Sequence, residues 1–117
     1  MNIHSYICRM EVNSSYKIDE VEAKRLQKVA FILKTVAHPT RLGIIKLLEV
    51  NKHLSVTQIC NELSTEQSLT SHHLQNMHLK GILSVERQGR SRMYSLKERD
   101  VSLIIDCLDN CQCNIQF

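Results

Sequence analysis

The chain has 117 residues, enough for one domain, and 43% of them are apolar, a share that excludes a disordered chain. Aromatic residues make up only 4% and tryptophan is absent, so we expect an aliphatic core of packed helices. No apolar run approaches the roughly 20 residues of a membrane span, and the net charge of +3 permits nucleic-acid binding without requiring it.

The N-terminal residues show no basic start followed by an apolar stretch, so we expect no secretory signal peptide. The five cysteines are an odd number, which favours a reducing cytoplasm with free thiols or metal ligands. Residues 1–17 lack periodicity and are predicted to be a partly ordered arm, with one domain over residues 18–117.

A long helix is predicted from Asp19 to Ala37, with Asp19 and Glu22 as a capping box at its start. Between Val29 and Leu33 this helix is apolar on nearly all sides. A surface helix with one buried face does not need that pattern. We therefore expect its own domain to cover one side and a second subunit to cover the other.

Pro39 ends the first helix and can begin the next, which is predicted to be a short core helix with the sequence PTRLGIIKLLEV. His38 stands alone at this junction. We expect it to make a local backbone contact rather than to act in catalysis.

A helix-turn-helix is predicted over residues 55–81, SVTQICNELSTEQSLTSHHLQNMHLKG. Capping boxes are expected at Ser55 with Gln58 and at Ser64 with Gln67, and Gly81 is expected to end the second helix. The second helix is rich in polar residues that are uncharged at neutral pH. Such side chains suit a helix in the DNA major groove, although an ordinary solvated helix face is the alternative.

A β-hairpin is predicted over residues 82–96, with a turn at Gln88 and Gly89. Its tip and approaches carry Arg87, Arg90 and Arg92, with few acidic residues nearby. The arginines favour contact with phosphates or the minor groove, although charges that prevent edge aggregation are the alternative. A hairpin of this kind after a helix-turn-helix is the wing of a winged helix.

The last helix is expected to start at Ser95 or Leu96 and to be strongly apolar. Its apolar residues recur at helical spacing, at Val101, Ile104, Ile105 and Leu108. We infer a mainly α fold with a small β-hairpin, in which the first and last helices pack together and build a two-fold homodimer.

The order of these elements resembles the ArsR/SmtB family of dimeric winged-helix repressors. The resemblance rests on LKTVAHPTRLGIIKLL, LTSHHLQNMHLKGIL and RQGRSRMYSL, between about residues 33 and 108. It implies an autoregulated repressor of a double-stranded DNA operator that an inducer releases. It also implies eight DNA-contacting residues, namely Gln67, Ser68, Thr70, Ser71, His72, His73, Arg90 and Arg92.

The chain departs from the metal-sensing patterns of that family. Arsenic and cadmium sensors carry a cysteine-rich stretch before the recognition helix, where this chain has Ser55, Thr57 and only Cys60. The zinc-site histidines of the last helix are also replaced. What remains is a C-terminal group of three cysteines, Cys107, Cys111 and Cys113. They suit a soft metal or metalloid, or a thiol redox switch, or they have no sensing role.

A DNA-binding regulator is the function that these features favour, with a protein-interaction module or a regulator without a small inducer as alternatives. An enzyme is not expected, because the sequence has no Gly-rich phosphate loop, no HExxH metal motif and no plausible carboxylate pair. The cofactor stays open between a thiophilic metal or metalloid and none, and no membrane partner is expected.

Overall fold

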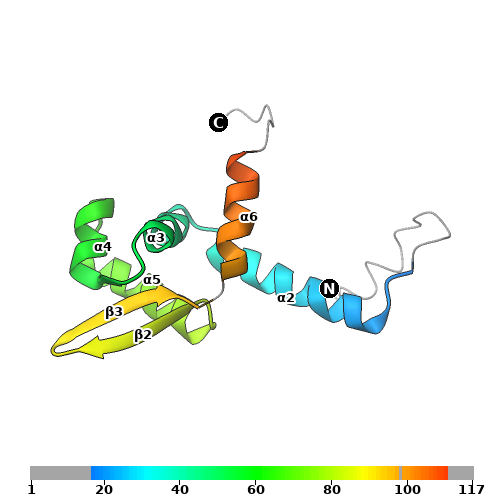
Figure 1. Ribbon diagram of the computed structural model, residues 1–117, viewed down its shortest axis with the longest axis horizontal. Helices are drawn as coiled ribbons and strands as arrows, with labels where there is room; N and C mark the ends of the chain where they lie inside the picture. Colours follow the sequence, from blue (N-terminus) through cyan, green and yellow to red (C-terminus); the bar gives the residue numbers. More distant parts are fainter. Residues whose placement is uncertain (1–16, 98, 111–117) are drawn as a thin grey trace. The chain divides into compact units, whose positions relative to one another are not determined.

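The computed structural model describes residues 17–97 and 99–110 (Figure 1). The predicted arm therefore lies almost wholly outside the described residues, as do Glu98, Cys111 and Cys113. The helices and strands in chain order are α2 (Glu20–Val36), α3 (Pro39–Val50), β1 (Leu54–Ser55), α4 (Val56–Leu63), α5 (Gln67–Leu79), β2 (Leu83–Gln88), β3 (Ser91–Leu96) and α6 (Arg99–Asp109).

The elements confirm a mainly helical winged helix-turn-helix with a small antiparallel sheet. The chain divides into two units, Met1–Lys34 and Thr35–Phe117. Within the described ranges, no helix has the length and apolar character that crossing a membrane requires.

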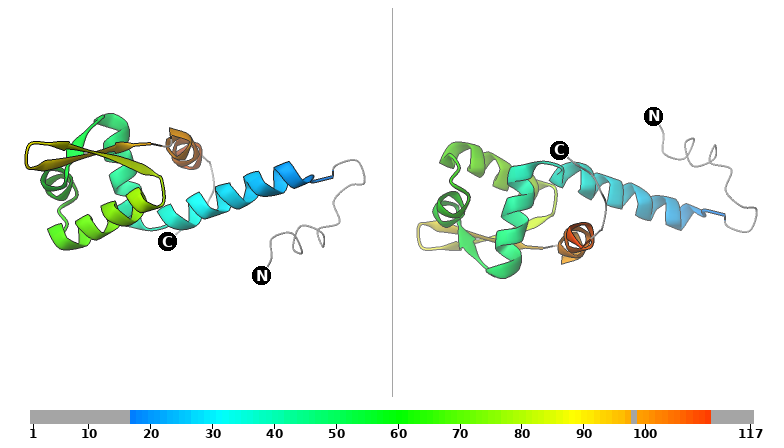
Figure 2. Two further views of the ribbon diagram at one scale, coloured as in Figure 1. Left: turned by 90° about the horizontal axis from the view of Figure 1, so that it is seen from below. Right: turned by 90° about the horizontal axis from the view of Figure 1, so that it is seen from above.

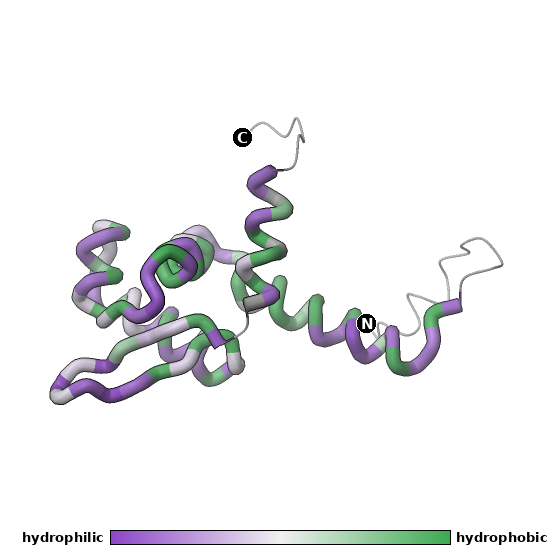
Figure 3. The backbone as a smooth tube through the Cα atoms, viewed as in Figure 1, coloured by the Kyte–Doolittle hydropathy of each residue, from purple (hydrophilic) through white to green (hydrophobic). Residues whose placement is uncertain are grey.

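In the first unit, α2 begins as predicted, because the backbone N–H of Glu22 donates to Asp19 Oδ1 over 2.8 Å. Apolar residues recur along the whole helix, as the hydropathy colours of the tube in Figure 3 show. Several of them are exposed, namely Val21, Leu26, Val29, Phe31 and Leu33.

The second unit contains an aliphatic core, as the composition predicts. Its fully buried side chains come from every layer of the helix-turn-helix and from the sheet. They include Ile44, Ile45, Ile59, Leu74, Met77, Ile82 and Leu83. Figure 2 shows α3, α4 and α5 grouped on one side of the hairpin strands. The core therefore fixes α5 relative to the hairpin, which is what positions a recognition helix beside a wing.

The caps of the helices follow the sequence at two points and depart from it at a third. His38 caps α3 by accepting the backbone N–H of Thr40 at Nδ1 over 3.1 Å, which confirms its local role. The reciprocal capping box of Ser55 and Gln58 is present. The box expected at Ser64 is wrong. Ser64 ends α4 in the left-handed region with φ of 52°, so it cannot take the extended backbone of an N-cap.

The sheet has the strand order β1-β3-β2 and is antiparallel. The hairpin prediction is confirmed, and its two-residue turn has Gly89 at the first central position with φ of 62°. The very short β1 pairs with β3 and was not predicted.

The last helix starts later than expected. Ser95 and Leu96 belong to β3, where Leu96 pairs with Leu83, and the backbone N–H of Lys97 donates to Ile82 O over 2.9 Å. The ladder therefore holds these residues in the sheet, and α6 begins at Arg99.

Candidate nucleic-acid interface

The recognition helix α5 is anchored at both ends by backbone contacts. Before it, the backbone N–H of Thr65 donates to Cys60 O over 3.1 Å and closes α4. After it, Gly81 adopts φ of 81°, and the N–H groups of Gly81 and Ile82 donate to the carbonyls of His78 and Met77 over 3.0 and 2.9 Å. This Schellman arrangement needs the left-handed backbone that glycine adopts freely.

One face of α5 is exposed and polar. Gln67, Ser68 and His72 are exposed and Ser71 is half-buried. Gln75, one turn beyond Ser71, is exposed too, although it is not among the residues that the family resemblance implies. Its side chain is polar and uncharged like those of its neighbours, and its spacing of four residues from Ser71 places it on the same side of the helix. This face presents amide, hydroxyl and imidazole groups, which can hydrogen bond to base edges and phosphates.

Thr70 and His73 are buried, at 0% and 6% exposure, which corrects the expectation that they face DNA. Thr70 Oγ1 lies 2.7 Å from Thr65 Oγ1, inside the turn that precedes α5. Both side chains lie on the core side of the helix, so they hold α5 in place and leave the exposed face to their neighbours.

His73 lies in a polar cluster beneath the helix. Its Nδ1 accepts the Nε–H of Arg41 over 3.0 Å, and its ring centroid is 4.5 Å from that of His38. Burial lowers the pKa of His73, and the neighbouring His38, Arg41 and His72 lower the pKa further. These surroundings favour the neutral form of His73.

The hairpin of β2 and β3 carries three exposed arginines. Arg87 and Arg92 are direct cross-strand partners, and Arg90 occupies the turn. In the part of the chain that the structure describes, none of the three forms an ion pair. Opposed like charges destabilise a hairpin. The arginines therefore form a positive tip suited to an anionic partner, and the tube in Figure 3 is hydrophilic there and apolar at its base.

Of the three cysteines of the predicted thiol site, only Cys107 lies among the described residues. Cys107 is exposed on α6, whereas Cys60 is buried. Cys111 and Cys113 lie outside the described residues. Across 17–97 and 99–110, no group of three or more metal-ligating side chains is found.

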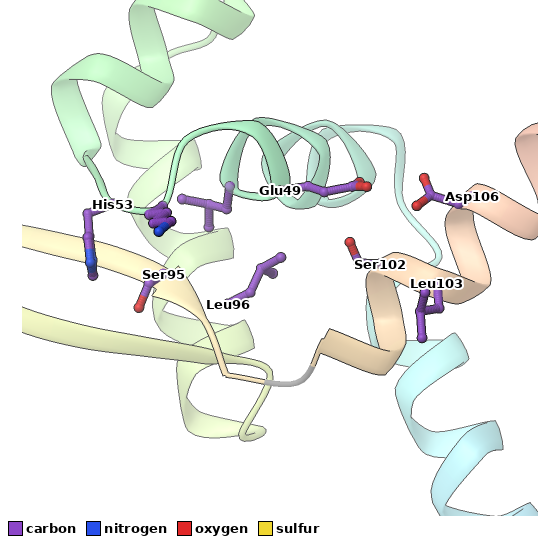
Figure 4. Close-up of a pocket in the computed structure, with 9 residues that line it drawn as sticks. Glu49, His53, Ser95, Leu96, Ser102, Leu103 and Asp106 are labelled. Carbon is purple, nitrogen blue, oxygen red and sulfur yellow. The ribbon is translucent and has the colours of Figure 1, made fainter.

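A depression of about 520 Å³ lies where α3, the end of β3 and α6 meet (Figure 4). Its lining mixes charged, hydroxyl and apolar side chains, namely Leu48, Glu49, Lys52, His53, Ser95, Leu96, Ser102, Leu103 and Asp106. Beside it, Lys46 Nζ lies 3.2 Å from Asp106 Oδ1 and 2.6 Å from Asp109 Oδ2 and joins α3 to α6. Sequence reasoning missed this site, because it depends on how α6 packs against α3.

Comparison with known proteins agrees with this geometry. Residues 38–85 match the family described as bacterial regulatory protein, arsR family. The transcriptional repressor PagR of Bacillus anthracis is 41% identical over 93 residues, covering 80% of this chain and 93% of PagR. The crystal structure of PagR has a TM-score of 0.66 at 42% identity, covering 73% of this chain and 97% of that one.

The repressor BigR from Xylella fastidiosa has a TM-score of 0.71 at 28% identity, covering 82% of this chain and 97% of that one. The family match spans α3 to the start of β2, the part that builds the exposed helix face. Fold, site and relatives agree, and the chain is therefore a DNA-binding transcriptional regulator that belongs to the ArsR family.

Proposed function

We propose that the chain is a cytoplasmic, homodimeric repressor that binds an operator in its own promoter. The observation that supports this proposal most directly is the uncharged polar face of α5, together with the positive tip of the hairpin. Base and phosphate contacts come from both elements, namely Gln67, Ser68, Ser71, His72, Arg90 and Arg92. Thr70 and His73 are not among them, because they are buried.

The exposed apolar residues of α2 and α6 support the dimer. Phe31 on α2 and Leu103 on α6 are large apolar side chains at 49% and 63% exposure. A two-fold dimer would bury such surfaces and would present two copies of α5 to half-sites about 34 Å apart.

A gel shift on fragments of the chain's own promoter tests the proposal. We expect the variant with Arg90→Ala and Arg92→Ala to bind the preferred fragment more weakly. The slope of log affinity against log salt should also fall by about 1 for each phosphate that is no longer neutralised. Lys97→Ala is the matched control, because Lys97 is exposed outside the tip, and it should leave both quantities unchanged.

Unchanged affinity in the double variant would remove the hairpin tip from the interface. If the wild type preferred no promoter fragment over random DNA, autoregulation would be contradicted.

We also propose that an inducer acts through Cys107, Cys111 and Cys113, as a thiophilic metal or metalloid or as a thiol oxidant. The exposure of Cys107 supports this, since an accessible thiol can react or bind a soft ion. Replacing all three with Ser should leave operator binding intact and abolish release by arsenite, zinc and diamide. Release of the triple variant by each of these agents would refute the proposal.

A further inference from the structure

Arg41 connects three parts of the second unit through its guanidinium group. Its Nε–H donates to His73 Nδ1 on α5 over 3.0 Å, and its Nη1 donates to the carbonyl of Thr35 over 2.8 Å. Arg41 itself lies in the first turn of α3. The Arg41 side chain thus connects three places in the chain. These are α3, the carbonyl of Thr35 near the end of α2, and His73 in the middle of the recognition helix.

The interaction depends on the protonation state of His73. A guanidinium group can only donate hydrogen bonds, so His73 Nδ1 has to be an unprotonated acceptor. The neutral imidazole then carries its proton on Nε2, which is buried and has no hydrogen-bond partner among the described residues. Protonation would place a second N–H against Arg41 and a buried positive charge beside a guanidinium group.

The surroundings of His73 make its protonation still less favourable. The charged and titratable groups that act on it are His38 before α3, Arg41 on α3 and His72 on α5 itself. Among the described residues, α4 and β2 also pack against α5 but supply no such group. Within those residues, no carboxylate therefore offsets a charge on His73.

We propose that Arg41 positions the recognition helix through His73, and that this hydrogen bond holds only while His73 is neutral, so that mild acidification weakens operator binding. The proposal rests on the operator binding proposed above. The expected pH dependence of operator affinity is opposite to the usual one. Protonation of exposed histidines normally adds positive charge near DNA and strengthens phosphate contacts.

The pH range follows from the lowered pKa of His73. As the pH falls, the unfolded chain takes up the proton first, near the ordinary histidine value of about 6.5. The stability that the neutral His73 contributes is therefore complete above about pH 6.5 and declines as the pH falls below it.

Operator affinity measured by fluorescence anisotropy from pH 8 to pH 5.5 tests the proposal. The probes are the promoter fragment selected in the gel shift and a scrambled duplex, at constant ionic strength. In the wild type we expect the affinity for the promoter fragment to decrease relative to that for the scrambled duplex as the pH falls, because protonation of His73 breaks its hydrogen bond with Arg41. The variant His73→Gln keeps an acceptor for Arg41 but does not titrate, so the ratio of its two affinities should stay constant.

His53→Gln is the matched control, because His53 is exposed and belongs to no proposed interaction. This variant should bind the promoter fragment with the wild-type affinity at pH 8. Its affinity relative to the scrambled duplex should decrease with falling pH as in the wild type. Identical pH profiles for the wild type and His73→Gln would overturn the inference while leaving operator binding intact. If no fragment is selected at any pH, the proposed function fails instead.

A second measurement serves if His73→Gln does not fold. In the wild type, NMR titration of the His73 ring should show a lower pKa in the presence of the operator than in its absence, because DNA favours the neutral form. A pKa raised by the operator would contradict the inference.

Discussion

At the scale of single residues, the second unit is held by side chains that satisfy backbone groups at helix ends. Ser55 accepts the backbone N–H of Gln58 over 3.2 Å, and Gln58 Oε1 accepts the backbone N–H of Ser55 over 2.9 Å. Two N–H groups that would lack partners are thus paired within one turn. This local pattern is visible in the sequence, since its partners are three residues apart.

Ser55→Ala should lower the free energy of unfolding by about 0.5–2 kcal/mol, because the N-cap hydrogen bond is removed. Urea unfolding followed by circular dichroism measures the change. Thr57→Ala, an exposed position on the same helix, is the control and should have little effect. Equal decreases in the two variants would mean that the capping box does not stabilise α4.

At the scale of elements, the existence of α5 could be predicted but its buried side could not. Large apolar residues of a helix are expected on its buried side, yet Leu69 of α5 is 49% exposed. The buried stripe is Thr70, His73, Leu74 and Met77, which follows helical spacing but begins with two polar residues. Their partners explain the difference.

Thr70 is paired within the preceding turn, whereas His73 is paired with Arg41, 32 positions away in the chain. Apolar periodicity cannot show such partners, because they exist only after α3 and α5 have packed. The late start of α6 has a similar cause, since pairing with β2 keeps Leu96 in the sheet. The capping box at Ser55 and the hairpin were predictable, whereas the box expected at Ser64 was wrong and interactions between distant elements could not be predicted.

At the scale of the whole molecule, two-fold symmetry is the property that the sequence and the exposed surfaces both favour. Leu103 is a large apolar side chain at 63% exposure on α6, one of the two helices whose apolar pattern favours a dimer surface. A dimer would bury it and would double the number of interactions with a palindromic operator.

Leu103→Asp should therefore produce monomers in analytical ultracentrifugation and reduce operator affinity about a hundredfold, because avidity is removed. Binding to a single half-site should be unchanged. Val50→Asp is the control, because Val50 is an exposed apolar residue on α3, outside the two helices proposed to form the dimer, and it should leave the dimer intact. A dimeric Leu103→Asp variant would exclude this part of α6 from the interface.

The shortness of β1 has a consequence for the hairpin. β1 pairs only with Met93 and Tyr94, so towards the turn the hairpin continues as a ribbon of two strands. An isolated two-stranded ribbon is only marginally stable in water. Arg87 and Arg92 oppose each other in that part, so their mutual repulsion weakens it further. A polyanion that lies against both guanidinium groups would act as their shared counterion, and binding and ordering of the tip would then be one thermodynamically linked event.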